Sequence, residues 1–439
     1  MAFFQARTSV AAVWVEPDNI LIKNDIQILS SAKTFHFPAF SWPVYAPDLD
    51  GALRNVDVSQ LSATQKIAKS RLERLLGRLK DKSHERFSNE RVEIGWSSEA
   101  NFNYGFSEGI DKSDGYYYSV EKSGIYKRLA YNLSFDQGDD IERFNGSYLA
   151  TTFGNITLTY GQQRRHWGAS QFSSFLFYST KEGLTGLHVQ NNTDFLSRPW
   201  QVQVFSGSIR GKPQMLPSDF LAFRFDLSLY DSASFAVSAI KYDGEEYLSN
   251  SSDLSVLGLD FQFNRTGYNF YTQLSTNYAS TISHTQPNIM MGLSGNLHSF
   301  ESEFMQSWAI EFLKTGNTHT SSYDQLLNFL TAVNRFSDFD SFGSKSVKIG
   351  YNLTDRNKWL VKANLGYMWT DDDSTILDPT EKRIVSVSGF KRAELGVSST
   401  FFVKKNVEIS ALFAITKQSE SVFTKNHYTN LAVNVGYFF

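Results

Sequence analysis

The sequence of 439 residues contains no cysteine. Disulfide bonds, zinc sites built from thiolates and thiol nucleophiles are therefore excluded together. No apolar run approaches the roughly 20 residues that a transmembrane helix requires, so a membrane could be crossed only by strands. The net charge is -3, and no Lys/Arg cluster lies beside exposed stacking aromatics. We therefore expect no nucleic-acid partner.

Signals for export and for chemistry are also scarce. The first residues lack a basic segment followed by an apolar stretch of roughly 7–15 residues, so they do not resemble an intact signal peptide. Export would imply that the natural leader has been removed. Histidines lack metal-ligand spacing, and the acidic groups near residues 136–142 and 371–373 match no defined calcium loop. No serine lies in a nucleophile elbow. The sequence thus predicts no metal, no cofactor and no enzymatic activity.

Aromatic residues, by contrast, are abundant. They make up 15% of the chain and include 37 phenylalanines, yet the mean hydropathy of -0.31 is that of a polar protein. A soluble protein with so many phenylalanines would normally be more apolar. A membrane-spanning β-barrel, with a lipid-facing aromatic surface and a wet interior, gives this mixture.

The chain has two regimes, which we assign to an N-terminal helical periplasmic region (1–88) and a transmembrane β-barrel (89–439). In the first, Ser62 and Gln65 have the spacing of a capping box. Apolar residues then follow at helical intervals and predict a docked helix: Ala68, Leu72, Leu75 and Leu79. A membrane-surface role for the basic residues on its other faces is an alternative.

The last strand shows the period-2 pattern of the second regime most clearly. Leu431, Val433, Val435, Tyr437 and Phe439 alternate with small or polar residues up to the last position. One side suits lipid and the other suits water. Similar alternation recurs in 221–230, 257–264 and 347–353, and Trp and Tyr recur at strand ends, where interfacial girdles place them.

The connections alternate between short and long, as periplasmic turns and extracellular loops do. Alternating runs number about nineteen, whereas single-chain bacterial barrels normally have an even count. Each connection can be assigned to one side of the membrane, working backward from the C-terminus or forward from the helical region. The two assignments agree only if Phe172–Thr180 does not span the membrane. The prediction is an antiparallel outer-membrane barrel of about eighteen strands in a Gram-negative bacterium. Segment 167–183 would then fold into the mouth as a lid or plug.

The densest polar group precedes this lid. Alternation from Ile156 places Gln163 and Arg165 toward the lumen, next to His166 and Trp167. Arg pairs with uronate carboxylates and aromatic rings stack on sugars, so these residues are candidates for a polysaccharide site. The alternative is a structural role in which Arg165 pairs with lumenal acids such as Asp226 or Asp260. The alternation also makes Arg224 a lumenal candidate.

Two motifs resemble those of the capsule-assembly Wzi family. Residues Asp25–Leu29, followed by Pro38 and Ser41–Pro43, resemble its D-I-x-x-L helix and P-x-x-x-W-P turn. Residues Gly161–Gly168 resemble its G-x-x-x-R-W-W-G-P motif, and weaker similarity continues through Leu257–Phe261 and the C-terminal strands. The resemblance implies an eighteen-stranded outer-membrane barrel with a helical bundle at its periplasmic mouth.

The resemblance further implies a lectin-like protein that holds capsular or exopolysaccharide at the cell surface and is not an enzyme. His166 stands where the family usually has Trp, Ala169 replaces its Pro, and the loop 317–343 lacks a long aromatic insertion. These departures bear on the polysaccharide's identity more than on the fold.

We therefore predict an outer-membrane protein that binds and anchors capsular or extracellular polysaccharide and helps capsule assembly. The alternative is a diffusion channel (porin) for small solutes or oligosaccharides, suggested by the polar lumen. A surface hydrolase would need a Ser and a His on the lumen or outer wall. Outer-membrane lipid and lipopolysaccharide are expected contacts, and the expected state is a monomer.

Overall fold

The computed structural model describes the chain from Trp14 to Phe438, with gaps. The residues outside the description are 1–13, 16–19, 33, 36, 38–40, 82–85, 88, 99–114, 127–128, 139–140, 144–145, 164, 171, 173, 178–183, 196–197, 210–217, 231, 245–253, 266, 280–285, 299–303, 317–340, 356–357, 379–382, 388, 405–406, 419–426 and 439.

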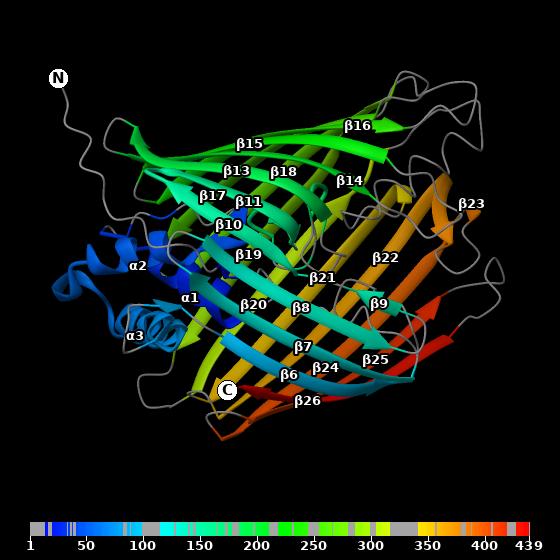
Figure 1. Cartoon of the computed structure of the whole chain (residues 1–439). Coiled ribbons are helices and arrows are strands. Elements are labelled where there is room, and N and C mark those ends of the chain that lie inside the picture. The colour runs from blue at the N-terminus through cyan, green and yellow to red at the C-terminus, as the bar shows by residue number, and fades with distance from the viewer. Residues whose placement is uncertain are drawn as a thin grey trace.

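Eighteen antiparallel strands form a closed barrel (Figure 1). In barrel order they are β6 (Asn89–Ser97), β7 (Gly115–Tyr126), β8 (Leu129–Gly138), β10 (Tyr148–Phe153), β11 (Ile156–Gln163), β13 (Leu184–Phe195), β14 (Arg198–Ile209), β15 (Ser218–Tyr230), β16 (Ala233–Gly244), β17 (Leu254–Arg265), β18 (Tyr268–Ala279), β19 (Asn288–His298), β20 (Phe304–Lys314), β21 (Ser341–Asp355), β22 (Trp359–Asp378), β24 (Lys391–Lys404), β25 (Val407–Gln418) and β26 (His427–Phe438). The barrel closes where β26 pairs with β6. The predicted fold and strand count are confirmed.

Two further short strands extend hairpins beyond the barrel wall. β9 (Ile141–Arg143) pairs with the end of β8, and β23 (Arg383–Val387) pairs with the extended end of β22. No helix in the described part of the chain has the length and apolarity needed to cross a membrane.

The barrel wall is apolar outside and polar inside. On β15, Leu221 and Phe223 are 53% and 41% exposed, whereas Arg224 and Asp226 are fully buried. The last strand repeats this arrangement, with Leu431, Val433, Val435 and Tyr437 exposed and Asn430 buried. This inversion is the arrangement of a barrel whose outer face meets lipid. It confirms the period-2 pattern read from the sequence; Phe439 lies outside the described residues.

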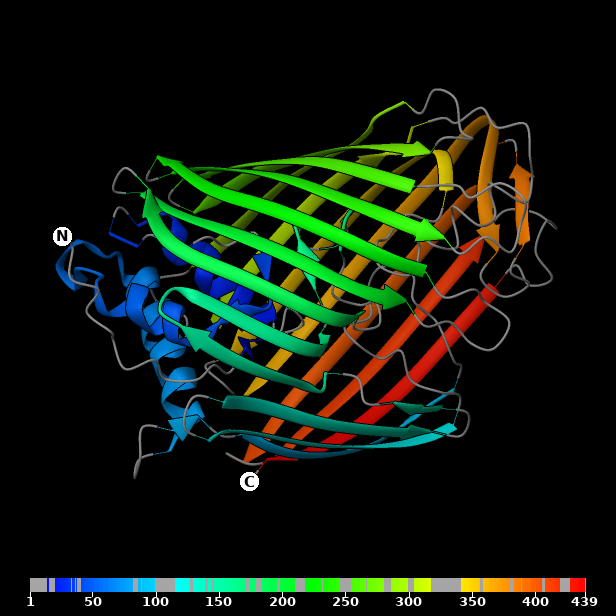
Figure 2. The same ribbon diagram turned by 45° about the horizontal axis from the view of Figure 1, so that its top comes forward.

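One end of the barrel carries the C-terminus, short turns and the helices. Phe438 pairs with Arg91 near the start of β6, and Val407, next to a short turn, pairs with Tyr437. Both ribbon views place the helices at this end (Figures 1 and 2). The long connections leave from the opposite end, which we call the long-loop end.

The N-terminal region supplies three α-helices: α1 (Ile20–Ser30), α2 (Ala46–Arg54) and α3 (Ala63–Leu79). A 3-10 turn, η1 (Val58–Gln60), precedes α3. Short strands also occur in this region: β1 (Trp14–Val15), β2 (Ser41–Trp42), β3 (Val44–Tyr45), β4 (Lys80–Asp81) and β5 (Arg86–Phe87).

The predicted capping box starts α3. The backbone N–H of Ser62 donates to Gln65 Oε1 at 2.9 Å, and the backbone N–H of Gln65 donates to Ser62 Oγ at 3.3 Å. Each side chain thus satisfies a backbone donor that a helix start leaves unpaired. Ala68 and Leu72 of the predicted apolar face are buried together with Leu76. The side chains of Leu75 and Leu79 lie outside the description.

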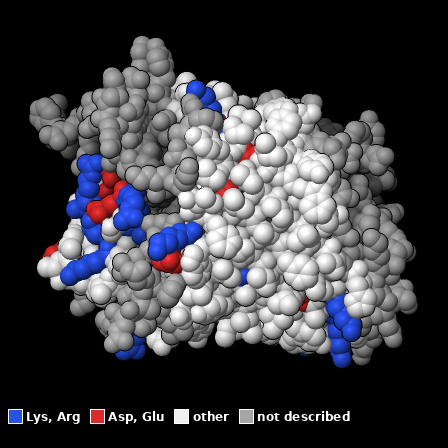
Figure 3. Space-filling model, turned by 90° about the horizontal axis from the view of Figure 1, so that it is seen from below, with Lys and Arg blue, Asp and Glu red and all other residues white. Residues whose placement is uncertain are grey.

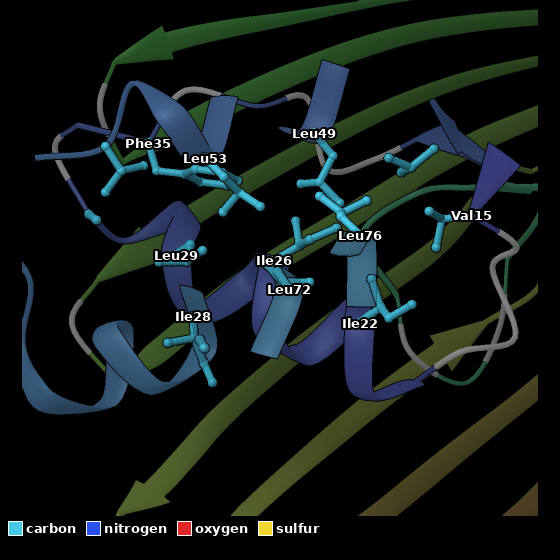
Figure 4. Close-up of a cluster of buried hydrophobic side chains, with 14 of the residues drawn as sticks. Val15, Ile22, Ile26, Ile28, Leu29, Phe35, Leu49, Leu53, Leu72 and Leu76 are labelled. Carbon is cyan, nitrogen blue, oxygen red and sulfur yellow. The ribbon is translucent and has the colours of Figure 1, made fainter. Parts of the chain in front are cut away.

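The helices pack around a shared apolar core. Figure 4 shows Ile22, Ile26 and Leu29 of α1 facing Leu72 and Leu76 of α3. Met305, on the inner face of β20, belongs to the same cluster. Because each fully buried aliphatic side chain contributes roughly 1.5–3 kcal/mol, this core attaches α1 to the barrel wall and holds α3 against it.

A buried ion pair links α1 to α3. Arg71 Nε donates to Asp25 Oδ2 at 2.8 Å, and its Nη2 also donates to Asp25 Oδ1. Burial disfavours the charged carboxylate more than Arg71 stabilises it, which raises the pKa of Asp25 to about 6. The folded protein therefore holds a proton on Asp25 at pH values where the unfolded chain has released it.

We expect the helical unit to be more stable near pH 4 than near pH 7. Between about pH 4 and pH 6 the folded state binds more protons at Asp25 than the unfolded state, so this residue alone lowers the free energy of unfolding by about 3 kcal/mol at most as pH rises. Burial raises the pKa of Asp48 in α2 to about 7, which acts in the same direction. Urea unfolding followed by tryptophan fluorescence measures this. Asp25→Asn should reduce the dependence, and the exposed control Glu73→Gln should retain it. An unchanged slope in Asp25→Asn would contradict the assignment.

Candidate functional site

A chain segment after β11 turns into the barrel interior. It comprises residues 165–170, 172 and 174–177, all buried, and is called the plug segment here. Within it, β12 (His166–Trp167) pairs antiparallel with β2 of the N-terminal region, matching His166 to Trp42 and Trp167 to Ser41. The plug segment and the N-terminal region therefore meet inside the barrel through backbone hydrogen bonds.

A buried arginine joins the wall to this junction. Arg224 of β15 bonds Asp226 Oδ1 through Nε at 2.9 Å and Asp260 Oδ2 through Nη1 at 2.6 Å. Nη1 also donates to Ser238 Oγ at 2.8 Å. Three neighbouring strands thus supply polar groups to one guanidinium. A fully buried charge is tolerated when it is paired and hydrogen-bonded in this way.

Ser41 extends this network to the N-terminal region. Its hydroxyl accepts from Arg224 Nε at 2.8 Å and donates to Asp226 Oδ2 at 2.5 Å. Ser41 also pairs with Trp167 along the backbone. Three parts therefore meet at Ser41: the charged group of the wall, strand β2 and the plug segment. The Trp167 ring lies 5.7 Å from Arg224 Cζ.

Side-chain amides on two other strands hold the plug segment. Gln273 of β18 donates to Asp260 Oδ1 at 2.7 Å and to the Trp167 carbonyl at 3.1 Å, and it accepts from the Phe175 backbone N–H at 2.9 Å. On β14, Gln203 accepts from the Trp167 indole N–H at 3.1 Å. The wall therefore satisfies backbone groups of the plug segment at Trp167 and Phe175.

Glu311 of β20 anchors the next stretch of the plug segment. Both of its carboxylate oxygens accept from Ser170 Oγ at 2.8 Å, and Oε1 also accepts from Tyr271 Oη at 2.5 Å. The Phe172 backbone N–H lies 3.3 Å from the same oxygen. A fully buried carboxylate with several donors is well satisfied, so Glu311 fixes the position of the plug segment against β18 and β20.

Aromatic rings fill the lumen next to the plug segment. Phe177 packs edge-on against Trp167 at 4.5 Å between ring centroids, and Phe205 and Phe220 of the wall lie 4.8 Å apart beside it. Arg165 stacks over Phe205, with Cζ 3.9 Å from the ring centroid, and its Nη2 donates to Gln163 Oε1 at 2.9 Å. Edge-to-face pairs and a stacked guanidinium each add to the apolar burial.

Helix α1 contacts the plug segment through Lys23. Its Nζ donates to the Ser170 carbonyl at 2.6 Å and lies 3.3 Å from His166 Nε2. Burial and the nearby Lys23 charge lower the pKa of His166 well below its usual value, so the imidazole is neutral. An ammonium can only donate, so Nε2 is the accepting nitrogen.

Two wall glycines make room for the plug segment. A Cβ on Gly350 of β21 would overlap the ring of Phe172, and a Cβ on Gly258 of β17 would lie 2.8 Å from Leu176 Cδ1. A side chain at either position would therefore displace the plug segment. The two glycines lie on strands that are far apart in the chain, and both leave space for the same plug segment.

The structure brings the five candidate residues together inside the barrel. Gln163, Arg165, His166, Trp167 and Arg224 are each at most 4% exposed. Their contacts are with protein groups: Phe205, Lys23, Gln203, Ser41 and the two acids. Asp226 and Asp260, which the sequence offered as partners of Arg165, form their salt bridges with Arg224.

Sequence reasoning missed Gln273, Glu311 and Ser41. The first two lie at inward positions of alternating strands, so periodicity could have placed them in the lumen. Nothing in the sequence indicates that they meet the plug segment. Among the described residues, no group of three or more His, Asp or Glu could hold a metal ion.

The chain was compared with known proteins. No protein-family model matches it, and no curated protein matches it. Among solved structures, Wzi, an outer-membrane protein involved in group 1 capsule assembly in Escherichia coli and described as a carbohydrate-binding β-barrel, is 15% identical, with a TM-score of 0.72. The match covers 97% of this chain and 99% of that one.

Two further outer-membrane proteins are more distant. OprD from Pseudomonas aeruginosa is 10% identical over 80% of this chain and 93% of its own, with a TM-score of 0.49. OccAB1 from Acinetobacter baumannii is 10% identical over 81% of this chain and 97% of its own, with a TM-score of 0.48. The inverted wall and the full-length match to Wzi agree: the chain has the fold of an outer-membrane β-barrel with the architecture of Wzi.

Proposed function

We propose that this protein binds capsular or extracellular polysaccharide at the surface of a Gram-negative bacterium and anchors it there during capsule assembly. The observation that carries the proposal is the match to the carbohydrate-binding barrel Wzi along nearly the whole of both chains. Binding is non-covalent and involves no chemical turnover. The helical end faces the periplasm and the long-loop end faces the medium, where polysaccharide is met.

The interior supports a binding protein over an open pore. The plug segment bonds to β14, β18 and β20 and pairs with β2, so it crosses the lumen between walls and N-terminal region. A freely permeable channel would need that space for solute. The barrel also closes on itself through β26 and β6, so a monomer is sufficient.

We propose that Arg165 holds the plug segment in place and that glycan contacts come from the long-loop end. Stacking on Phe205 and a bond to Gln163 use its guanidinium inside the protein. Arg165→Ala is therefore expected to lower the melting temperature and leave glycan affinity within about twofold. The matched control is Arg265→Ala, an exposed arginine on the outer face of β17.

The function itself is tested in two ways. Detergent-solubilised protein should bind acidic capsule fragments on a glycan array. A strain that lacks the gene should release polysaccharide into the medium that the parent strain retains on its cells. A deletion strain that keeps all of its cell-associated polysaccharide would overturn the proposal. Loss of glycan binding in Arg165→Ala at an unchanged melting temperature would instead place Arg165 in the glycan site.

A further inference from the structure

Four lysines point outward at the long-loop ends of neighbouring strands. They are Lys314 of β20, Lys345 of β21, Lys391 of β24 and Lys417 of β25, called the lysine row here. Their direction follows from alternation. Lys314, Lys391 and Lys417 are exposed, as are Phe312, Ala393 and Ile415 two residues further into each strand.

Strand register brings these lysines together. Lys314 pairs with Lys345, Lys345 with Trp369 of β22, and Trp369 with Lys391. Lys417 pairs with Ala393, two residues from Lys391. Adjacent strands lie about 4.8 Å apart, so the row extends over about 19 Å from β20 to β25. That width can span a headgroup with more than one anionic group.

The surroundings of the lysine row are those of a membrane interface. Apolar side chains continue along the same outer faces toward the helical end, including Ile310, Leu395 and Phe413. Within the row, Trp369 stacks on Tyr367 at 5.8 Å between ring centroids. Paired aromatics next to lysines at the edge of an apolar belt mark the level of lipid headgroups.

Among the side chains that the structure describes, exposed lysines at the long-loop end are more frequent on this side of the barrel. Among the side chains described at the long-loop ends of β15 and β16, the exposed outward charges are Asp219 and Lys241, one of each sign. Figure 3 shows this outer face as largely uncharged, with a small group of basic side chains at the end away from the helices and a larger mixed group of basic and acidic side chains at the helical end. If water alone surrounded the long-loop end, there would be no reason for exposed lysines to gather on one side of it. Lysines beside a lipid-facing belt are complementary to an anionic lipid headgroup. Asp371, Asp372 and Asp373 follow Trp369 on β22, and their side chains lie outside the described ones.

We propose that the lysine row binds the phosphate groups of a phosphorylated glycolipid in the outer leaflet. The ammonium groups meet the phosphates, and the acyl chains lie against the apolar faces of β20 to β25. The proposal relies on the orientation given in the proposed function and is independent of polysaccharide binding. Such a lipid would hold this side of the barrel at the membrane surface.

Binding of lipid A to purified protein in detergent, measured by native mass spectrometry, tests this proposal. The test variant is the double substitution Lys314→Gln and Lys417→Gln. The matched control is Lys122→Gln with Arg265→Gln, two outward-facing basic residues at the opposite end of the barrel. Each lysine at a charged lipid surface contributes roughly a fivefold gain in affinity. We therefore expect about 25-fold weaker binding in the test variant and binding within twofold of wild type in the control.

The phosphate requirement is tested with enzymatically dephosphorylated lipid A. Wild-type protein should bind it no better than the test variant binds the phosphorylated form, and added salt should weaken only phosphate-dependent binding. Wild-type affinity in the test variant, or equal binding of both lipids, would overturn the proposal. Glycan retention by the test variant, measured separately, distinguishes this result from a failure of the proposed function.

Discussion

Replacing Arg224 with methionine is expected to destabilise the barrel interior by about 3–5 kcal/mol. Asp226 and Asp260 would then remain buried, with side chains at most 1% exposed, and without the cation that neutralises them. Removing one partner of a buried charged group leaves the full desolvation cost of the others. The measurement is urea unfolding in detergent, followed by tryptophan fluorescence.

A variant that removes the whole charged group is the control for this prediction. Arg224→Met combined with Asp226→Asn and Asp260→Asn leaves no buried charge at this point, so it should regain most of the lost stability. Because Ser41 bonds both Arg224 and Asp226, proteolysis of the N-terminal region should be faster in the single variant. Equal stability of the single variant and wild type would show that the network does not hold the interior.

The barrel itself could be predicted because the residue pattern that forms it can be read within each strand. Each strand must present apolar residues to lipid and polar residues to the lumen. Apolar and polar residues therefore alternate along each strand, as in Leu221 to Asp226. The parity of turns and loops then fixed the count and removed one false strand. The capping box at Ser62 was equally local, and its two hydrogen bonds are present.

The candidate site could be predicted only in part. Alternation placed Gln163, Arg165 and Arg224 toward the lumen, where the structure has them buried. It could not say which lumenal groups meet, because those contacts cross the barrel. Ser41 bonds Asp226 over 185 positions in the chain, and no periodicity links them. Arg224 forms the salt bridges with the two lumenal acids that the sequence also offered as partners of Arg165.

The wild-type barrel is expected to show no steady current in a planar lipid bilayer, whereas a variant with a weakened plug segment should conduct. The variant is Phe172→Ala, Phe175→Ala and Phe177→Ala. All three rings are buried, and each large-to-small change in a packed interior costs about 3–5 kcal/mol. Phe172 fits against Gly350 and Phe177 packs on Trp167, so the segment loses contacts on both sides.

The matched control truncates three outward-facing phenylalanines of the wall: Phe223→Ala, Phe263→Ala and Phe413→Ala. These side chains are 41% exposed in each case and do not touch the lumen, so the control should stay closed. A steady current from the wild-type protein would favour the diffusion channel over the polysaccharide-binding barrel. Closed behaviour of the plug variant, with the barrel still folded by circular dichroism, would mean that the N-terminal region blocks the lumen without the plug segment. The β2–β12 pairing argues against that outcome, because the two parts position each other.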